Sequence, residues 1–170
     1  GVVSATTDNE HKTVIDLVPK ELMRDGLFPA GRLDSDTTGF VLITDDGDFA
    51  HRILSPKNHI FKTYLARLEH SLTESDIKLI ESGITLADGT TLKEAKLEIV
   101  EDSINPLVKI MICEGKYHQV RRMMASRNMP VAYLERQQEG NLTLGDLPRG
   151  QVRELTEEEI RQLEDDSNQK

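Results

Sequence analysis

Runs of apolar residues bounded by turn residues divide this chain into short strands and short helices. Strands are predicted at 39–44, 61–68, 92–100, 107–113, 130–135 and 141–144. Helices are predicted at 13–18, 48–54, 117–126 and 156–163, and a further helix that carries Ile77, Leu79 and Ile80 is predicted after the residues 71–74. The Asn105-Pro106 turn makes 92–100 and 107–113 an antiparallel pair, and similar turns join most of the other strands. The pattern therefore predicts an α+β fold with a largely antiparallel mixed sheet flanked by helices.

Capping residues mark where several of these helices begin. Thr13 and Asp48 each precede a helical pattern, and an N-cap side chain of this kind accepts a hydrogen bond from the first turn. Capping boxes are predicted at Ser71-Leu72-Thr73-Glu74 and at Thr156-Glu157-Glu158-Glu159.

Two segments place polar residues on a common face. The alternation over 61–68 puts Lys62 and Tyr64 on one face of a strand. In the helix over 117–126, the apolar positions recur at helical spacing and should face the core; they are Val120, Met123 and Met124. The polar positions His118, Arg121 and Arg122 are then left on the opposite face.

Length and composition fit a globular protein of one domain, or of two small lobes that share a sheet. The chain has 170 residues, 37% of them hydrophobic, and no apolar run approaches the roughly 20 residues that span a membrane. The single cysteine, Cys113, lies within an apolar strand, so we expect a buried thiol and no intramolecular disulfide. A cytoplasmic location fits this composition.

The net charge of −9 argues against a nucleic-acid partner, but the charge is unevenly distributed. Residues 49–68 contain four Lys or Arg residues and no acidic residue. Residues 115–136 contain five Lys or Arg residues against Glu135 alone. The acidic residues are concentrated in 69–102 and 154–166, which could face away from a polyanion.

The strongest candidate for chemistry is the loop Gly31-Arg32-Leu33-Asp34-Ser35-Asp36-Thr37-Thr38-Gly39, which leads into the first of these strands. A loop on a rigid sheet can hold a catalytic side chain open to substrate, and Asp34 is the candidate nucleophile. Asp and Ser before a strand also serve as plain turn residues. A second alternative is an Mg²⁺-dependent hydrolase whose ligands are Asp34, Asp36, Asp45 and Asp46.

Several motifs together resemble the bacterial pseudouridine synthases that modify ribosomal RNA. They are Gly31 to Thr44, His51-Arg52-Ile53, Ser55-Pro56, Lys62-Thr63-Tyr64 and Glu114 to Met123. The spellings Asp-Thr-Thr-Gly and Thr-Asp-Asp-Gly are closest to the branch called ribosomal small-subunit pseudouridine synthase A. The resemblance implies a catalytic domain over 1–164 with a central active-site cleft. It also implies a truncated start that lacks an N-terminal RNA-binding module, followed by a frayed tail at 165–170.

The resemblance assigns roles to individual residues. It makes Asp34 the catalytic carboxylate, Arg121 the cation that pairs with it, and Tyr64 the ring that stacks on the target uracil. Arg122 takes the place of Arg121 if the register shifts by one, and Arg32 fills the gap left by a flipped nucleotide. The candidate RNA contacts are Arg32, Arg52, Lys57, His59, Lys62, Lys116, His118 and Arg122.

The same resemblance implies an isomerase that needs no cofactor and no metal, because the reaction has no redox step. The expected partner of a monomeric enzyme is ribosomal RNA, as small-subunit (16S) RNA or a small-subunit assembly intermediate, with no membrane. Two alternatives remain open at this point, a large-subunit (23S) target and a non-catalytic ribosomal RNA-binding module.

Overall fold

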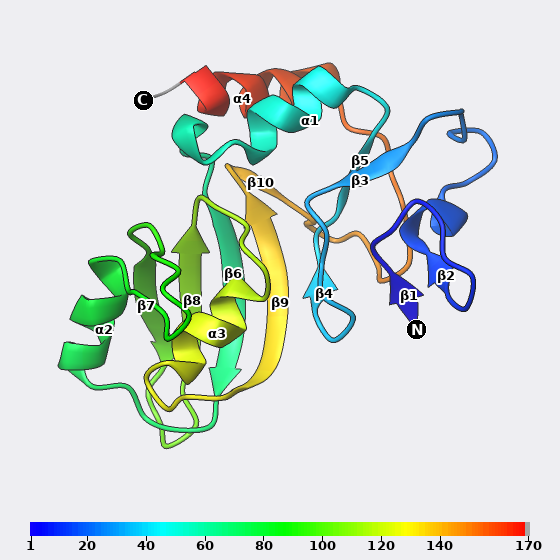
Figure 1. The fold of residues 1–170 in the computed structure, drawn as a ribbon. Helices are drawn as coiled ribbons and strands as arrows, with labels where there is room; N and C mark the ends of the chain where they lie inside the picture. The colour runs from blue at the N-terminus through cyan, green and yellow to red at the C-terminus, as the bar shows by residue number, and fades with distance from the viewer. Residues whose placement is uncertain (169–170) are drawn as a thin grey trace. The chain divides into compact units, whose positions relative to one another are not determined.

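The computed structural model describes residues 1–168, with residues 167–168 described by their backbone alone. The chain forms two compact units. The first unit contains 1–60 and 138–170, and the second contains 61–137. The α+β fold class predicted from the sequence is confirmed, because antiparallel strand pairs, one parallel pair and helices are all present (Figure 1).

The second unit is an antiparallel sheet with helices packed against it (Figure 1). Its elements are β6 (Lys62–Leu68), α2 (Glu74–Glu81), β7 (Lys96–Glu101), β8 (Leu107–Ile112), α3 (Gln119–Ala125) and β9 (Val131–Glu139), the last two residues of β9 belonging to the first unit. The strand order is β9-β6-β8-β7. The predicted pairing of the strands on either side of the Asn105-Pro106 turn is confirmed, although β7 begins at Lys96 and carries an irregularity between Ile99 and Glu101.

Alternation along β6 and β8 builds the core of this unit. Ala66 and Leu68 of β6 face the same core as Val108 and Ile110 of β8, and the helices add further apolar side chains to it. The helical contributions are Ile80, Val120, Met123 and Met124. The predicted core positions of the helix over 117–126 are therefore confirmed.

The start of α2 differs from the prediction. Thr73, rather than Ser71, is the N-cap, and its side chain and Asp76 form the capping box. Asp76 Oδ1 also accepts a hydrogen bond from Arg127 Nε at 3.0 Å. Burial raises the pKa of Asp76, but the hydrogen bonds from Thr73 and Arg127 outweigh it, so that the pKa lies below its usual value.

The first unit is made of short strands and helices around its own core. Its elements are β1 (Val2–Val3), β2 (Lys12–Thr13), η1 (Val14–Leu17), β3 (Phe28–Ala30), β4 (Thr38–Gly39), β5 (Leu42–Thr44), α1 (Gly47–Leu54), η2 (Pro56–Asn58), β10 (Leu142–Thr143) and α4 (Glu157–Asn168). Strands β1 and β2 pair in parallel, and β3 and β5 pair in antiparallel. Helices α1 and α4 lie side by side (Figure 1).

Three predictions for this unit can be compared with the structure. Thr13 caps η1 as predicted. The strand predicted at 39–44 is interrupted, because β4 ends at Gly39 and β5 begins at Leu42, while Phe40 between them is buried in the core. Asp48 is not the cap of α1; Asp46 is, since its side chain accepts a hydrogen bond from the Phe49 N–H at 3.0 Å.

Helix α4 begins with the predicted capping box. The Thr156 N–H donates to Glu159 Oε1 at 2.9 Å, and the Glu159 N–H donates to Thr156 Oγ1 at 3.1 Å. The helix continues to Asn168, whereas the sequence predicts a frayed tail at 165–170, whose last two residues lie outside the described residues. Within the described part of the chain, no helix is long and apolar enough to cross a membrane.

Candidate functional site

Asp34 lies in the loop between β3 and β4 of the first unit, as predicted. Its carbonyl accepts a hydrogen bond from the Thr37 N–H at 3.0 Å, which closes a turn over 34–37. The paired strands β3 and β5 anchor the two sides of the segment, and the Asp34 side chain is half-buried. Asp34 can therefore serve both as a turn residue and as a catalytic residue. Its backbone makes the turn, while the residue is only half-buried.

Four predicted RNA contacts lie in the same unit, among them the exposed His59, which follows η2 with a left-handed φ of 54°. Arg32 is exposed, and its Nε donates to the Ser4 carbonyl at 2.7 Å. Arg52 on α1 pairs with Glu164 at 3.3 Å, and both side chains are about two-fifths exposed. Lys57 is exposed in η2. Their roles in RNA binding stay predictions.

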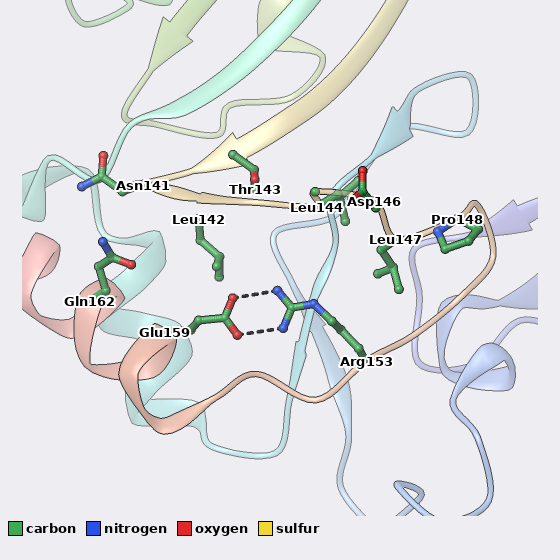
Figure 2. Close-up of a pocket in the computed structure, with 11 residues that line it drawn as sticks. Asn141, Leu142, Thr143, Leu144, Asp146, Leu147, Pro148, Arg153, Glu159 and Gln162 are labelled. Carbon is green, nitrogen blue, oxygen red and sulfur yellow. Dashed lines mark hydrogen bonds and ion pairs between the residues drawn. The ribbon is translucent and has the colours of Figure 1, made fainter.

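Two cavities open in the first unit, and neither is lined by Asp34. The one shown in Figure 2 has a volume of about 570 Å³ and is lined by the segment 141–148 together with Arg153, Glu159 and Gln162. The other has a volume of about 660 Å³ and is lined by apolar and polar residues, among them those of β5 and of the segment 150–155.

Tyr64 and Lys62 lie on strand β6 of the second unit and share a face, as the alternation predicts. That face packs on the core. The Tyr64 ring is half-buried against it, and the Lys62 side chain is only 3% exposed. Arg136, one of the cations of the second basic segment, is also buried. Both of these cations are therefore buried in the described structure.

A buried carboxylate organises the loop before α3. Glu114 is 2% exposed, and its Oε1 accepts hydrogen bonds from the Lys93 N–H at 2.7 Å and from Gln119 Nε2 at 3.0 Å. Gln119 Oε1 in turn accepts from the Lys116 N–H at 3.0 Å. The two side chains therefore fix both ends of the loop that leads into α3.

Arg121 and Arg122 follow on the exposed side of α3. Arg121 is half-buried, and its Nη1 donates to the Val131 carbonyl at 3.1 Å. Arg122 donates from Nη1 to the Tyr117 carbonyl at 3.2 Å and pairs through Nη2 with Asp88 at 2.6 Å. The pKa of Asp88 is lowered by hydrogen bonds from Thr90 and by this arginine.

His118 does not lie within the helix, contrary to the prediction. It is the N-cap residue, with a left-handed φ of 47°, and its ring stacks on that of Tyr117 with centroids 3.9 Å apart and an interplanar angle of 13°. The exposed Lys116 donates to the Thr91 carbonyl at 2.8 Å. The segment 116–122 thus gathers three predicted RNA-binding residues, Lys116, His118 and Arg122, in one place.

The predicted residues fall into two groups. Asp34, Arg32, Arg52, Lys57 and His59 belong to the first unit, and the others belong to the second. The pairing of Asp34 with Arg121 stays a prediction. Across the described residues, no group of three or more His, Cys, Asp or Glu side chains is placed so that it could hold a metal ion.

Sequence reasoning missed the roles of Glu114 and Tyr117. Glu114 lies two residues after the end of β8 and next to the buried Cys113, and a carboxylate in such a place indicates an internal hydrogen-bond acceptor. Tyr117 lies between Lys116 and His118 in a loop, where an aromatic residue has no core to fill.

Comparison with known proteins places these motifs in one family. The family model described as RNA pseudouridylate synthase matches residues 1–126. An uncharacterized RNA pseudouridine synthase of Bacillus subtilis, YtzG, is 47% identical over 165 residues, which cover 96% of this chain and 69% of the relative. Ribosomal small subunit pseudouridine synthase A of Escherichia coli is 43% identical over 162 residues, which cover 94% of this chain and 68% of the relative.

A solved structure agrees with the sequence matches. The crystal structure of a pseudouridylate synthase is 41% identical and superposes with a TM-score of 0.85, covering 96% of this chain and 69% of that one. Similarity at this level extends over nearly the whole chain and includes both the loop of Asp34 and the segment before α3. The chain belongs to the RNA pseudouridylate synthase family and is an isomerase of that class.

Proposed function

We propose that this chain converts a specific uridine of ribosomal RNA to pseudouridine, and that the target lies in small-subunit (16S) RNA. The observation that carries the proposal is the 43% identity over 162 residues to a protein named ribosomal small subunit pseudouridine synthase A. The reaction breaks the bond between N1 and C1′, turns the base, and joins C5 to C1′. A proton leaves C5 and N1 gains one, so that atoms and electrons balance without a redox cofactor.

Asp34 is the proposed catalytic carboxylate. Two routes fit a carboxylate in this reaction, attack on C1′ or elimination to a glycal, and both need the ionised form. A guanidinium within a few ångströms lowers a carboxylate pKa by about 1 to 3 units. Arg121 is the proposed partner that keeps Asp34 ionised and oriented. The half-buried place of Asp34 at a loop between strands supports this role, since substrate can reach it.

Tyr64 is the proposed residue that stacks on the uracil. A tyrosine offers a flat face and a hydroxyl in one side chain, which suits a base taken out of its stack. The Tyr64 ring is half-buried against the core of its unit, and this packing limits its motion. The exposed ones among the other predicted cations, Arg32, Lys57 and Lys116, are the proposed phosphate contacts.

The experiment is pseudouridine mapping, nucleotide by nucleotide, in 16S and 23S ribosomal RNA treated with the protein in the presence of a chelator. The unmutated protein should form one new pseudouridine in 16S RNA. Asp34→Asn should form none and should still bind the RNA. Asp36→Asn is the matched control, because Asp36 is an exposed carboxylate of the same turn, and it should keep the activity.

Three outcomes would contradict the proposal. Product in 23S RNA alone would overturn the small-subunit target. Activity that survives Asp34→Asn would remove that residue from the chemistry. Binding without product by the unmutated protein, on free RNA and on assembly intermediates alike, would favour a non-catalytic RNA-binding module.

A further inference from the structure

Tyr117 is the most exposed of the phenylalanine and tyrosine residues of this protein, and its ring is stacked on a neighbour. Its side chain is 75% exposed, and one face of the ring is covered by the stacked ring of His118. An aromatic residue in water is usually free to adopt several rotamers, whereas a ring stacked on a neighbour is restricted. The other face of the Tyr117 ring is open to solvent.

The backbone under the two rings is held from several directions. Arg122 donates to the Tyr117 carbonyl and is itself anchored by Asp88. The preceding residue, Lys116, is held through its N–H by Gln119. The stacked pair is therefore preorganised, so that the two side chains lose little conformational entropy when a ligand stacks on them.

The charge around the pair favours a polyanion. Residues 115–134 contain four Lys or Arg residues and no Asp or Glu, in a chain whose net charge is −9. Lys116 directly precedes Tyr117 in the sequence, and Arg122 Nη1 donates to the Tyr117 carbonyl. Each cation also has an acidic neighbour, Glu114 Oε2 at 3.9 Å from Lys116 Nζ and Asp88 Oδ2 at 2.6 Å from Arg122 Nη2. Exposed aromatic faces among cations are the features with which proteins bind unpaired nucleic acid, since bases stack on the rings while cations attract the backbone.

We propose that the Tyr117–His118 pair is a stacking platform for an unpaired base of the RNA substrate, distinct from the base that is isomerised. The base extends the stack on the open face of Tyr117, and the neighbouring cations attract the phosphates that flank it. This inference rests on the proposed function only in taking RNA as the ligand. Because stacking reads no hydrogen-bond pattern, the platform supplies affinity and register rather than sequence choice.

The test uses a labelled oligoadenylate of about 12 nucleotides, which contains no uridine and so cannot be a substrate. Binding is measured by fluorescence anisotropy. Tyr117→Ala should weaken binding about 5- to 150-fold, the range found when a base loses its aromatic partner. Tyr117→Phe should bind as the unmutated protein does. Tyr133→Ala is the matched control, because Tyr133 is another exposed tyrosine of the same unit, and it should also leave binding unchanged.

A second readout reports stacking itself. The protein has three tyrosines and no tryptophan, so tyrosine fluorescence can be followed directly. Bound oligoadenylate should quench it, and Tyr117→Ala should lose that quenching while Tyr133→Ala keeps it. A merely structural role of Tyr117 would lower the thermal midpoint without removing a specific quenching signal.

The results separate this inference from the proposed function. Unchanged affinity and quenching in Tyr117→Ala, or no binding of oligoadenylate by the unmutated protein, would overturn the platform even if pseudouridine forms. Equal losses in Tyr117→Ala and Tyr117→Phe would mean that the hydroxyl, and not the ring face, makes the contact, and would also overturn it. Tyr117-dependent binding without pseudouridine formation would support the platform and contradict the proposed function.

Discussion

Arg153 and Glu159 are joined by two parallel hydrogen bonds, Nη1 to Oε1 and Nη2 to Oε2, each of 2.7 Å (Figure 2). The arginine precedes α4 and the glutamate lies in its first turn, where it also completes the capping box with Thr156. Bidentate pairing is the geometry in which arginine binds a carboxylate most strongly. The pair therefore ties the segment before α4 to the start of the helix.

The Arg153–Glu159 pair should make the stability of the folded protein depend on pH in the acidic range. The hydrogen bonds from Arg153, and then that from the Thr156 backbone, lower the pKa of Glu159 from 4.5 to about 2. Because the folded-state pKa is depressed, the stabilisation is present above pH 4.5 and is lost as the pH falls toward 2. The thermal midpoint of the unmutated protein should fall more over this range than that of Glu159→Gln. Glu157→Gln, at an exposed carboxylate of the same turn, should behave as the unmutated protein; an equal effect of both variants would contradict the prediction.

Glu114 should stabilise the second unit through its hydrogen bonds. Glu114→Ala leaves the Lys93 N–H and the Gln119 side chain without their buried acceptor, which should cost about 1–3 kcal/mol in the free energy of unfolding. Glu114→Gln is the matched control. Both hydrogen bonds end on Oε1, so a glutamine that places its carbonyl oxygen there keeps them. Urea unfolding of the two variants measures the difference. Equal destabilisation would mean that the charge, which lies 3.9 Å from Lys116 Nζ, matters more than the hydrogen bonds.

Gly83 and Gly89 should differ in their tolerance of a side chain. Both have a left-handed backbone, with φ of 91° and 88°, which costs a residue with a Cβ about 1–2 kcal/mol. A Cβ at Gly83, just after α2, would lie 2.8 Å from the Leu92 carbonyl oxygen, whereas a Cβ at Gly89 would meet nothing within 4 Å. Gly83→Ala should therefore lower the free energy of unfolding more than Gly89→Ala. Equal losses in chemical denaturation would show that the loop around Leu92 relaxes.

Lys57 and Lys62 should differ in RNA binding, although the sequence places both among the candidate phosphate contacts. Lys57 is exposed, and Lys57→Ala should weaken binding and reduce the slope of log affinity against log salt by about 1. Lys62 is 3% exposed, so Lys62→Met should leave the slope unchanged and alter the thermal midpoint instead. A reduced slope in Lys62→Met would mean that its ammonium reaches a phosphate in the complex.

Local patterns predicted much of this protein because the forces behind them act over a few residues. Thr13 caps η1, Thr156 and Glu159 form their capping box, and the apolar spacing of 120–124 indicates the buried side of α3. The family could be recognised in the same way, since its motifs are contiguous stretches around Asp34 and before α3.

The N-cap residues of α2 and α1 were predicted wrongly, because more than one nearby residue has a side chain that can cap a helix. Ser71 and Thr73 each precede an acidic residue at the spacing of a capping box, and the structure uses Thr73 with Asp76, which Arg127 contacts from more than 50 residues away. The sequence pattern predicted Asp48 as the cap of α1, whereas the structure uses Asp46, two residues earlier. A contact with a distant residue cannot be read from the few residues around a cap.

The sequence by itself thus determined the family, the α+β class, most elements and the loop that holds Asp34. Only the tertiary structure decided which polar side chains reach the surface. Alternation along β6 gives two faces, but both carry apolar residues, and only the tertiary structure shows that Lys62 is buried. The same holds for Glu114, whose partners come from two segments, and for Tyr117, whose order depends on Arg122 and Asp88. Whether a residue is buried depends on all the residues that pack around it, and many of these lie far away in the sequence. A short stretch of sequence therefore does not determine burial.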